Sequence, residues 1–246
     1  MHVLLEVCCG SAEDAAIAAA AGAHRVELNA ALPLGGLTPS IGTLLLAKKA
    51  NLPCIAMVRP REGGFCYSET EFETMLLDAE SLLLAGADGI AFGILHADGT
   101  VDAARCRQMV ELIGPKEAVF HRAFDVTPDW RAALDTLCAL GIRRVLTSGQ
   151  KPAAIEGAAT IKEMISYAAG RIELLPGAGI RPHNVRAFLQ ETACTQVHAS
   201  LRTTREEASC SRNPAIRFGG GDAASECTVS LTDAQQVQEL LSALNG

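Results

Sequence analysis

The chain has 246 residues, of which 49% are hydrophobic and only 4% aromatic, and its formal net charge is −7 at pH 7. This length and composition suit one large α/β core and argue against a disordered chain. Because the sequence is acidic and has no segment dense in lysine or arginine, we expect neither nucleic acid nor an anionic membrane as a partner.

The cysteine content predicts a reducing environment. There are nine cysteines, an odd number without regular spacing, which is typical of free thiols in the cytoplasm. The first apolar run contains Glu6, which does not fit a secretory signal, and no uncharged run approaches the length of a membrane span. We therefore expect a cytoplasmic protein without a membrane segment.

Three glycines, Gly22, Gly86 and Gly141, each follow an apolar, helix-like segment and precede a short apolar run. Glycine at such a place is typical of the left-handed residue that ends a helix. The following run has the length of a buried strand. Units of helix, glycine and strand can bury their apolar faces only by stacking, as parallel strands under a layer of helices.

Eight runs along the chain are predicted to be strands. In order they are Val3–Cys8, Val26–Asn29, Cys54–Arg59, Gly89–Gly93, Ala118–Arg122, Arg144–Ser148, Ile172–Pro176 and Gln196–Ser200. Eight is the number that a (β/α)8 barrel, or TIM barrel, needs. Ser68 with Glu71 fits a capping box at the start of one of the intervening helices.

We predict a single α/β domain over residues 1–246 with the (β/α)8 TIM-barrel fold. The exception is a long irregular segment at 201–231, before the last helix, which is polar and contains Gly219-Gly220-Gly221. Loops of this length are usually lids, binding loops or disordered segments. A surface crossing that lies against a neighbouring subunit is an equally acceptable interpretation.

The carboxyl ends of the strands are the expected place for chemistry in such a barrel. Because side chains alternate along a strand, Glu6 and Cys8 share one face of the first strand, and Arg25, Glu27 and Asn29 share one face of the second. Buried charges are rarely unpaired, so both glutamates need cationic partners.

The candidate partners are three arginines near strand ends, Arg59, Arg61 and Arg122. With them, Glu6 and Glu27 form either a catalytic or ligand-binding group or a structural ion-pair network, which also perturbs pKa values.

Two histidines also end strands. His121, followed closely by Asp125, and His198 are candidates for general acid and base, since the pKa of histidine lies near neutral pH. The alternative is that each is a hydrogen-bonded core histidine. Their place at the same end of the barrel favours a function.

An anion site is predicted after the seventh strand. Gly177 and Gly179 expose backbone amides, and Arg181-Pro182 is expected to begin the next helix, a combination that favours phosphate or carboxylate. Ser148 and the amides near Ser200 are predicted as further donors. Glycines at this place also serve tight turns, so the pattern has two interpretations.

Seven segments in order along the chain resemble the CutC copper-homeostasis family. They are Leu5-Glu6-Val7-Cys8, Arg25-Val26-Glu27-Leu28, Gly35–Ser40, Val58-Arg59-Pro60-Arg61, Phe120–Asp125, Leu146–Gln150 and Val197–Ser200. The resemblance implies a cytoplasmic (β/α)8 barrel, commonly a homodimer, with a role in copper handling.

The resemblance also implies that thiols at the ends of the first two strands bind copper, and Cu(I) prefers soft sulfur ligands. Cys8 occupies the first position, but Asn29 stands where the family usually has cysteine, which predicts weaker Cu(I) binding. Two functions therefore remain open. One is copper binding at the barrel mouth, and the other is an enzyme that acts on a small anionic metabolite there.

Overall fold

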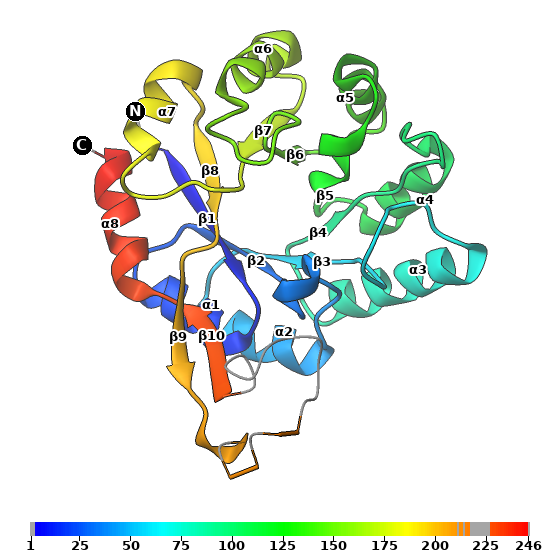
Figure 1. Ribbon diagram of the computed structural model, residues 1–246. Helices are drawn as coiled ribbons and strands as arrows, with labels where there is room; N and C mark the ends of the chain where they lie inside the picture. The colour runs from blue at the N-terminus through cyan, green and yellow to red at the C-terminus, as the bar shows by residue number, and fades with distance from the viewer. Residues whose placement is uncertain (1–2, 211, 214, 217–226, 246) are drawn as a thin grey trace.

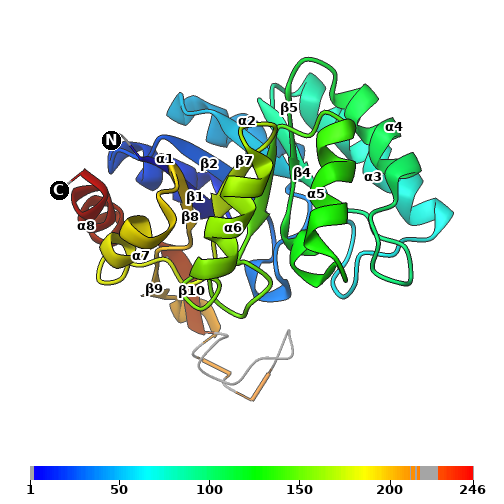
Figure 2. The same ribbon diagram turned by 90° about the horizontal axis from the view of Figure 1, so that it is seen from above.

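Eight short parallel strands form the centre of the molecule, and helices surround them (Figures 1 and 2). The computed structural model describes residues 3–210, 212–213, 215–216 and 227–245. The strands of the barrel are β1 (Leu4–Cys9), β2 (Arg25–Leu28), β3 (Cys54–Met57), β4 (Gly89–Phe92), β5 (Glu117–Phe120), β6 (Arg144–Thr147), β7 (Glu173–Pro176) and β8 (Gln196–Ala199).

The strands follow one another around the barrel in sequence order, and β1 pairs in parallel with both β2 and β8. This register places Cys8 beside Glu27 and Glu6 beside His198. Between β7 and β8 the described residues form no hydrogen-bonded ladder, so the barrel is nearly closed. The predicted (β/α)8 fold is confirmed, and each predicted strand matches an observed one to within two residues.

The α-helices of the described ranges lie outside the strands. They are α1 (Ala12–Ala20), α2 (Ile41–Ala47), α3 (Glu69–Leu84), α4 (Ala103–Ile113), α5 (Trp130–Ala139), α6 (Ala158–Ala168), α7 (Val185–Thr192) and α8 (Ala234–Asn245). The capping box of Ser68 and Glu71 is present at the start of α3, and Phe72, Met75 and Ala79 form its buried face. None of these helices has both the length and the apolar character to cross a membrane.

The interior of the barrel has two unlike halves. On the side of β3, β4 and β5 it is filled by a small apolar cluster of Ile55, Met57, Ala91 and Val119. Alternation along β3 explains the cluster, because Cys54 and the residues at every second position after it belong to the outer core under the helices.

On the other side, polar side chains cross the interior from the amino ends of the strands toward the mouth. Arg144 lies 3.1 Å from Glu173, Gln196 donates to Glu173 at 3.2 Å, and Arg25 donates to Gln196 at 3.0 Å and binds Glu6. We call these five residues the polar column. The charged and polar side chains of this column, which are hydrogen-bonded to one another, occupy a space that apolar side chains usually fill in barrel proteins.

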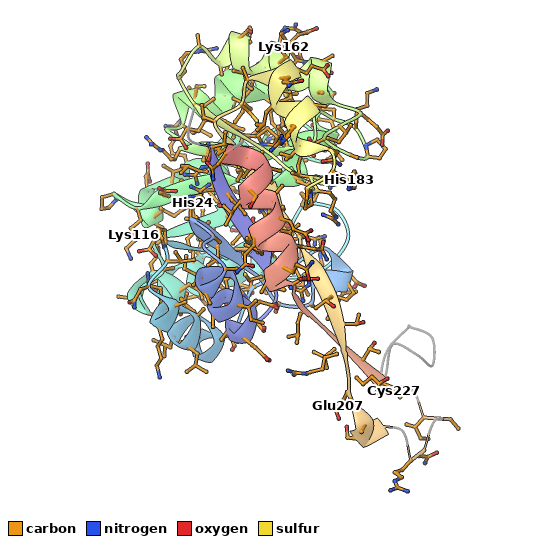
Figure 3. All side chains as sticks on the ribbon, turned by 90° about the vertical axis from the view of Figure 1, so that its left-hand side faces the viewer. His24, Lys116, Lys162, His183, Glu207 and Cys227 are labelled. Carbon is orange, nitrogen blue, oxygen red and sulfur yellow. The ribbon has the colours of Figure 1, made fainter. Side chains whose placement is uncertain are left out.

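The expectation of an irregular segment at 201–231 is wrong at both of its ends. β9 (Arg202–Glu206) and β10 (Thr228–Thr232) form an antiparallel hairpin that extends away from the barrel (Figure 3). Its side chains are mostly exposed and polar, so the sequence shows no apolar pattern there. The buried carboxylate of Asp14 fixes its base by accepting from Arg202 and from the N–H of Thr232. Gly219-Gly220-Gly221, in the middle of the predicted irregular segment, lie outside the described residues.

Candidate functional site

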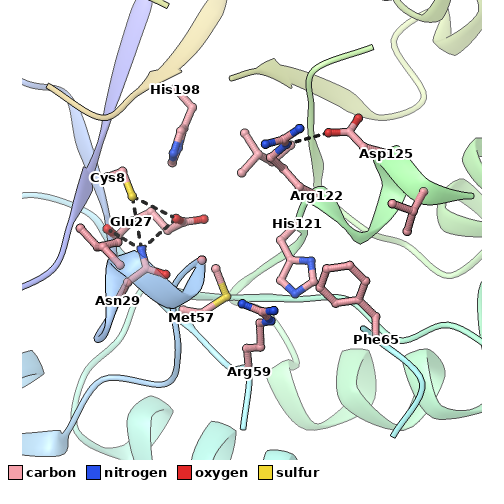
Figure 4. Close-up of a pocket in the computed structure, with 14 residues that line it drawn as sticks. Cys8, Glu27, Asn29, Met57, Arg59, Phe65, His121, Arg122, Asp125 and His198 are labelled. Carbon is pink, nitrogen blue, oxygen red and sulfur yellow. Dashed lines mark hydrogen bonds and ion pairs between the residues drawn. The ribbon is translucent and has the colours of Figure 1, made fainter. Parts of the chain in front are cut away.

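A pocket of about 350 Å³ opens at the carboxyl ends of the strands. Its lining consists of Cys8, Glu27, Asn29, Leu32, Gly35, Met57, Arg59, Phe65, His121, Arg122, Asp125, Val126, Leu146 and His198. Figure 4 shows two opposite walls. We call Cys8, Glu27, Asn29 and His198 the thiol wall, and Phe65, His121, Arg122 and Asp125 the aromatic wall.

Three side chains with metal-binding atoms meet on the thiol wall. The sulfur of Cys8, a carboxylate oxygen of Glu27 and a ring nitrogen of His198 all lie within 4.8 Å of one another. They come from β1, β2 and β8, whose neighbouring register brings the three strand ends together. Thiolate and imidazole suit Cu(I) or Zn(II), and carboxylate suits harder ions. The sequence predicts all three at the mouth of the barrel, and in the structure they lie side by side.

His198 is held by a buried ion pair. Its Nδ1 lies 2.8 Å from Oε1 of Glu6, whose other oxygen binds Arg25. Burial raises the pKa of Glu6, but Arg25 and His198 outweigh burial and lower it to about 2. Burial also disfavours the charged form of His198, yet Glu27, Cys8 and Glu6 raise its pKa well above the usual value. Because Nδ1 is bonded to Glu6, Nε2 of His198 is left for the pocket.

Asn29 supports two of the three possible ligands. Its amide nitrogen donates to Oε2 of Glu27 at 2.9 Å and lies 3.6 Å from the sulfur of Cys8. Burial raises the pKa of both Cys8 and Glu27, although His198 acts in the opposite direction on each. Gly36 leaves room for this amide, since a Cβ there would lie 2.4 Å from Oδ1 of Asn29. The sequence predicts only a lost thiol at position 29, and the structure adds a hydrogen-bond donor.

His121, on the aromatic wall, has a different environment. Its Nδ1 accepts from the backbone N–H of Ala123 at 3.1 Å, and its ring centre lies 5.1 Å from that of Phe65. Burial lowers the pKa of His121 to about 3, and the charge of Arg59 acts in the same direction. His121 is therefore a neutral imidazole with its proton on Nε2. A Cβ at position 93 would lie 2.5 Å from the ring, which explains Gly93.

Arg122 is fixed at the rim of the aromatic wall. Its Nε donates to Asp125 at 2.8 Å and its Nη2 donates to the hydroxyl of Ser148 at 2.8 Å. Asp125 also accepts from the hydroxyl of Thr147 and from the N–H groups of Ser148 and Gln150. The carboxylate of Asp125 is thus committed to holding Arg122 and the loop after β6. The side chain of Arg122 remains 42% exposed.

None of the three predicted arginines pairs with the strand-embedded glutamates, since Arg122 binds Asp125 and Ser148. Arg59 lines the pocket, but its guanidinium donates to three backbone carbonyls of neighbouring loops. Arg61 lies outside the pocket lining, because its guanidinium binds the carboxylate of Glu71 at the start of α3. The prediction that Arg61 leans into the mouth is therefore wrong. The partner of Glu6 is Arg25, which lies directly opposite it in the register of β1 and β2.

Gly177 serves close packing beside His198. Its N–H donates to the carbonyl of Thr147 at 2.9 Å. A Cβ at this position would lie 2.8 Å from Leu146 and 3.2 Å from the side chain of His198. The absence of a side chain therefore lets the end of β7 approach the thiol wall.

The remaining predicted anion donors lie away from the pocket. Gly179 and Ser200 are not part of its lining. The predicted helix start at Arg181 is wrong, because Asn184 accepts from the N–H of Arg181 and donates to the carbonyl of Gly179, which closes a turn. The helix α7 begins only at Val185. Anion binding by this loop stays a prediction.

Sequence reasoning missed Arg25 and Phe65 as parts of the site. Arg25 shares an inward face with Glu27, and this alternation was a usable signal for a buried cation next to Glu6. Phe65 follows Gly63-Gly64 in an irregular loop. No periodic pattern predicts that its ring packs on His121.

The fold and the site define a (β/α)8-barrel protein with a group of possible metal ligands at its mouth. The model of the CutC family matches residues 3–203, and the chain belongs to the CutC family.

Relatives match almost the whole chain. A family protein CutC of Treponema denticola is 47% identical over 244 residues, which cover 99% of both chains. The copper homeostasis protein cutC homolog of Homo sapiens is 42% identical over 96% of this chain and 87% of its own length. The crystal structure of a CutC protein from Streptococcus agalactiae superposes with a TM-score of 0.77. It is 32% identical and covers 80% of this chain and 98% of its own.

Proposed function

We propose that the protein acts in copper homeostasis by binding one Cu(I) ion at the thiol wall. The observation that carries this proposal is the meeting of Cys8, His198 and Glu27 within 4.8 Å. Cu(I) favours a soft thiolate and accepts an imidazole nitrogen. The names of the human and streptococcal relatives both refer to copper homeostasis, which agrees with this function.

The ligands have supports of the kind that metal sites use. Glu6 holds Nδ1 of His198, so that Nε2 can reach an ion, and Asn29 donates toward both Cys8 and Glu27. Two ligands bonded to one ion at roughly 2.0–2.3 Å lie at most about 4.5 Å apart. The observed cluster needs to contract only slightly to reach that size.

Competition with a chromogenic Cu(I) chelator tests the proposal. Loss of a group that only supports a ligand costs roughly 10–100-fold in affinity, so Cys8→Ser should cost more than that. Cys66→Ser is the matched control, because Cys66 is an exposed free thiol outside the pocket lining. Equal Cu(I) affinity in wild type and Cys8→Ser would contradict the proposal. Tight Zn(II) binding without Cu(I) binding would assign the site to a different metal.

A second variant restores the thiol that the family usually has. Asn29→Cys should tighten Cu(I) binding, because a second thiolate replaces an amide that is a poor partner for a soft ion. Cys8→Ser in that background should remove the gain. A gain that survives Cys8→Ser would show that the new thiol works with another ligand.

A second candidate function is an enzyme for a small anionic metabolite. The pocket, at about 350 Å³, is much larger than one ion requires, and Arg122 is fixed at its rim. Native mass spectrometry of the purified protein tests for a retained metabolite. Activity assays on the compound so identified then distinguish an enzyme from a binding protein.

Cytoplasmic location and a homodimer belong to the same proposal. The free cysteines of the described residues include Cys8, Cys66 and Cys138, which suits a reducing compartment. Helix α2 exposes Leu45 and Leu46, which are candidates for a subunit contact. Analytical ultracentrifugation of wild type and a Leu45→Glu variant tests the dimer. A wild-type monomer would contradict it.

A further inference from the structure

Copper binding uses only the thiol wall and leaves most of the pocket unexplained. The volume of about 350 Å³ lies within the range of small-molecule sites, roughly 300–1,000 Å³. Beyond the possible metal ligands, the lining is largely apolar and includes Leu32, Met57, Phe65, Val126 and Leu146. Such a lining favours the binding of an organic molecule with an apolar body over the binding of a molecule that is polar throughout.

Arg122 provides the polar end of this space. The edge of its guanidinium formed by Nε and Nη2 is held by Asp125 and Ser148. Among the described residues, Nη1 of Arg122 has no hydrogen-bond partner, so one N–H of Nη1 and one of Nη2 remain free on the adjacent edge. Two parallel N–H groups of one guanidinium match the two oxygens of a carboxylate. Because Asp125 and Ser148 already fix the side chain, little conformational entropy is lost on binding.

Most other cationic and amide groups near the mouth have protein partners, and His198, on the opposite wall, lies within 4.8 Å of a carboxylate oxygen of Glu27. Nη1 and Nη2 of Arg59 donate to three backbone carbonyls and its Nε is fully buried, while Gly177 donates its N–H to Thr147. Glu27 also lines the pocket and opposes a multiply charged anion. A phosphate group, with a charge of about −1.5 to −2 near neutral pH, would therefore lack partners. A single carboxylate finds a hydrogen-bond donor for each of its two oxygens at Arg122.

We propose that the pocket binds a small monocarboxylate with an apolar or aromatic body. Its carboxylate pairs with the free guanidinium edge of Arg122, and its body lies against Phe65, Met57 and Leu146. The inference rests on the metabolite site of the second candidate function and names the chemical class of its ligand. It does not depend on copper.

Benzoate is the probe, because it joins one carboxylate to an apolar ring, and isothermal titration calorimetry is the measurement. We expect saturable binding in the roughly millimolar range for so small a ligand. Benzamide, which has the same shape without the charge, and inorganic phosphate should each bind at least about tenfold more weakly. Saturable binding of phosphate as tight as that of benzoate, or no saturable binding of benzoate, overturns the inference.

Two arginine variants locate the site. Arg122→Gln should weaken benzoate binding about tenfold or more, since a charge-assisted hydrogen-bond pair is lost. Arg122→Lys keeps the charge without the fork and should fall between wild type and Arg122→Gln. Arg186→Gln, at an exposed position of α7, is the matched control and should bind like wild type. Equal affinity of Arg122→Gln and wild type, with both folded by circular dichroism, overturns the inference.

The same variants separate the two proposals. Cys8→Ser should weaken Cu(I) binding far more than benzoate binding, whereas Arg122→Gln should weaken benzoate binding far more than Cu(I) binding. A wild-type protein that binds Cu(I) but not benzoate overturns the monocarboxylate site alone, and one that binds benzoate but not Cu(I) overturns the copper site alone. Benzoate serves as a ligand and not as a substrate, so failure of the enzyme candidate shows as missing turnover and not as missing binding.

Discussion

His198 and His121 end two strands of one barrel and face the same pocket from opposite walls, yet the pKa values of their rings are shifted in opposite directions. His198 has a carboxylate of Glu6 on its Nδ1, and its pKa lies well above the usual value despite burial. His121 has the backbone N–H of Ala123 on its Nδ1, and burial lowers its pKa to about 3. The charges around each ring make the difference, because Glu27, Cys8 and Glu6 outweigh burial at His198, whereas Arg59 acts together with burial at His121.

This difference bears on the expected acid–base pair. A general acid or base works best when its pKa lies near the operating pH. Neither His198 nor His121 has such a pKa in the protein without ligands. The geometry instead favours His198 as a possible metal ligand, which releases a proton when an ion binds, and His121 as a fixed neutral side chain of the aromatic wall.

The largest expected effect concerns the ion pair behind His198. Glu6→Gln leaves the buried charge of Arg25 without its partner, and breaking a buried pair in this way costs roughly 3–5 kcal/mol of unfolding free energy. Urea unfolding followed by circular dichroism measures the loss. Glu69→Gln is the control, because its ion pair with Arg105 is exposed and contributes about 1 kcal/mol at most. Similar losses in both variants would show that Glu6 does not support the thiol wall in this way.

The second prediction concerns the space occupied by His121. Gly93→Ala should destabilise the protein by about 2–3 kcal/mol, because the new Cβ would meet the ring and the side chain of Ala123. Combining it with His121→Ala should recover part of the loss relative to the sum of the two single variants. Strict additivity of the two changes would mean that the ring does not fill this space.

The third prediction uses the lowered pKa of His121. The unfolded chain takes up a proton near pH 6.5, whereas the folded His121 does so only near pH 3. Between these values the unfolded state binds more protons, so stability falls as the pH falls, by about 1.4 kcal/mol per pH unit.

The test compares wild type with His121→Gln by urea unfolding at pH 7 and pH 5. The wild type should lose about 2 kcal/mol more than the variant over this interval. An identical pH response of wild type and His121→Gln would mean that the folded His121 titrates normally.

The smallest expected effect concerns the approach of β7 to His198. Gly177→Ala places a Cβ 3.2 Å from the His198 side chain, a contact that a small shift relieves. We expect a loss of about 1 kcal/mol, less than for Gly93→Ala. Thermal unfolding of the two variants gives the ranking. The reverse order would show that the thiol wall is the more tightly packed of the two.

The fold was predictable because its signals are local. Gly22, Gly86 and Gly141 all have positive φ where helices end, and each strand that follows is a short apolar run. The inward faces of β1 and β2 also followed from alternation, which placed Cys8 and Glu27 in one site.

The partners of these residues were not predictable, because they depend on register. That Glu6 lies beside Arg25 follows only from how β1 and β2 are paired, and a shift of one residue would break the ion pair. The hairpin had no local signal either, since it is fixed by the contact of Arg202 with Asp14, 188 residues earlier in the chain.

The polar column makes the rear of the barrel part of the chemistry at its mouth. Arg144, at the amino end of β6, already lowers the pKa of Glu6 by its charge alone. A substitution at Arg144 or Glu173 therefore changes the electrostatic potential at His198 without altering any residue that a ligand touches. Evolution or protein engineering can thus tune the mouth from the amino ends of the strands, and leave the shape of the pocket as it is.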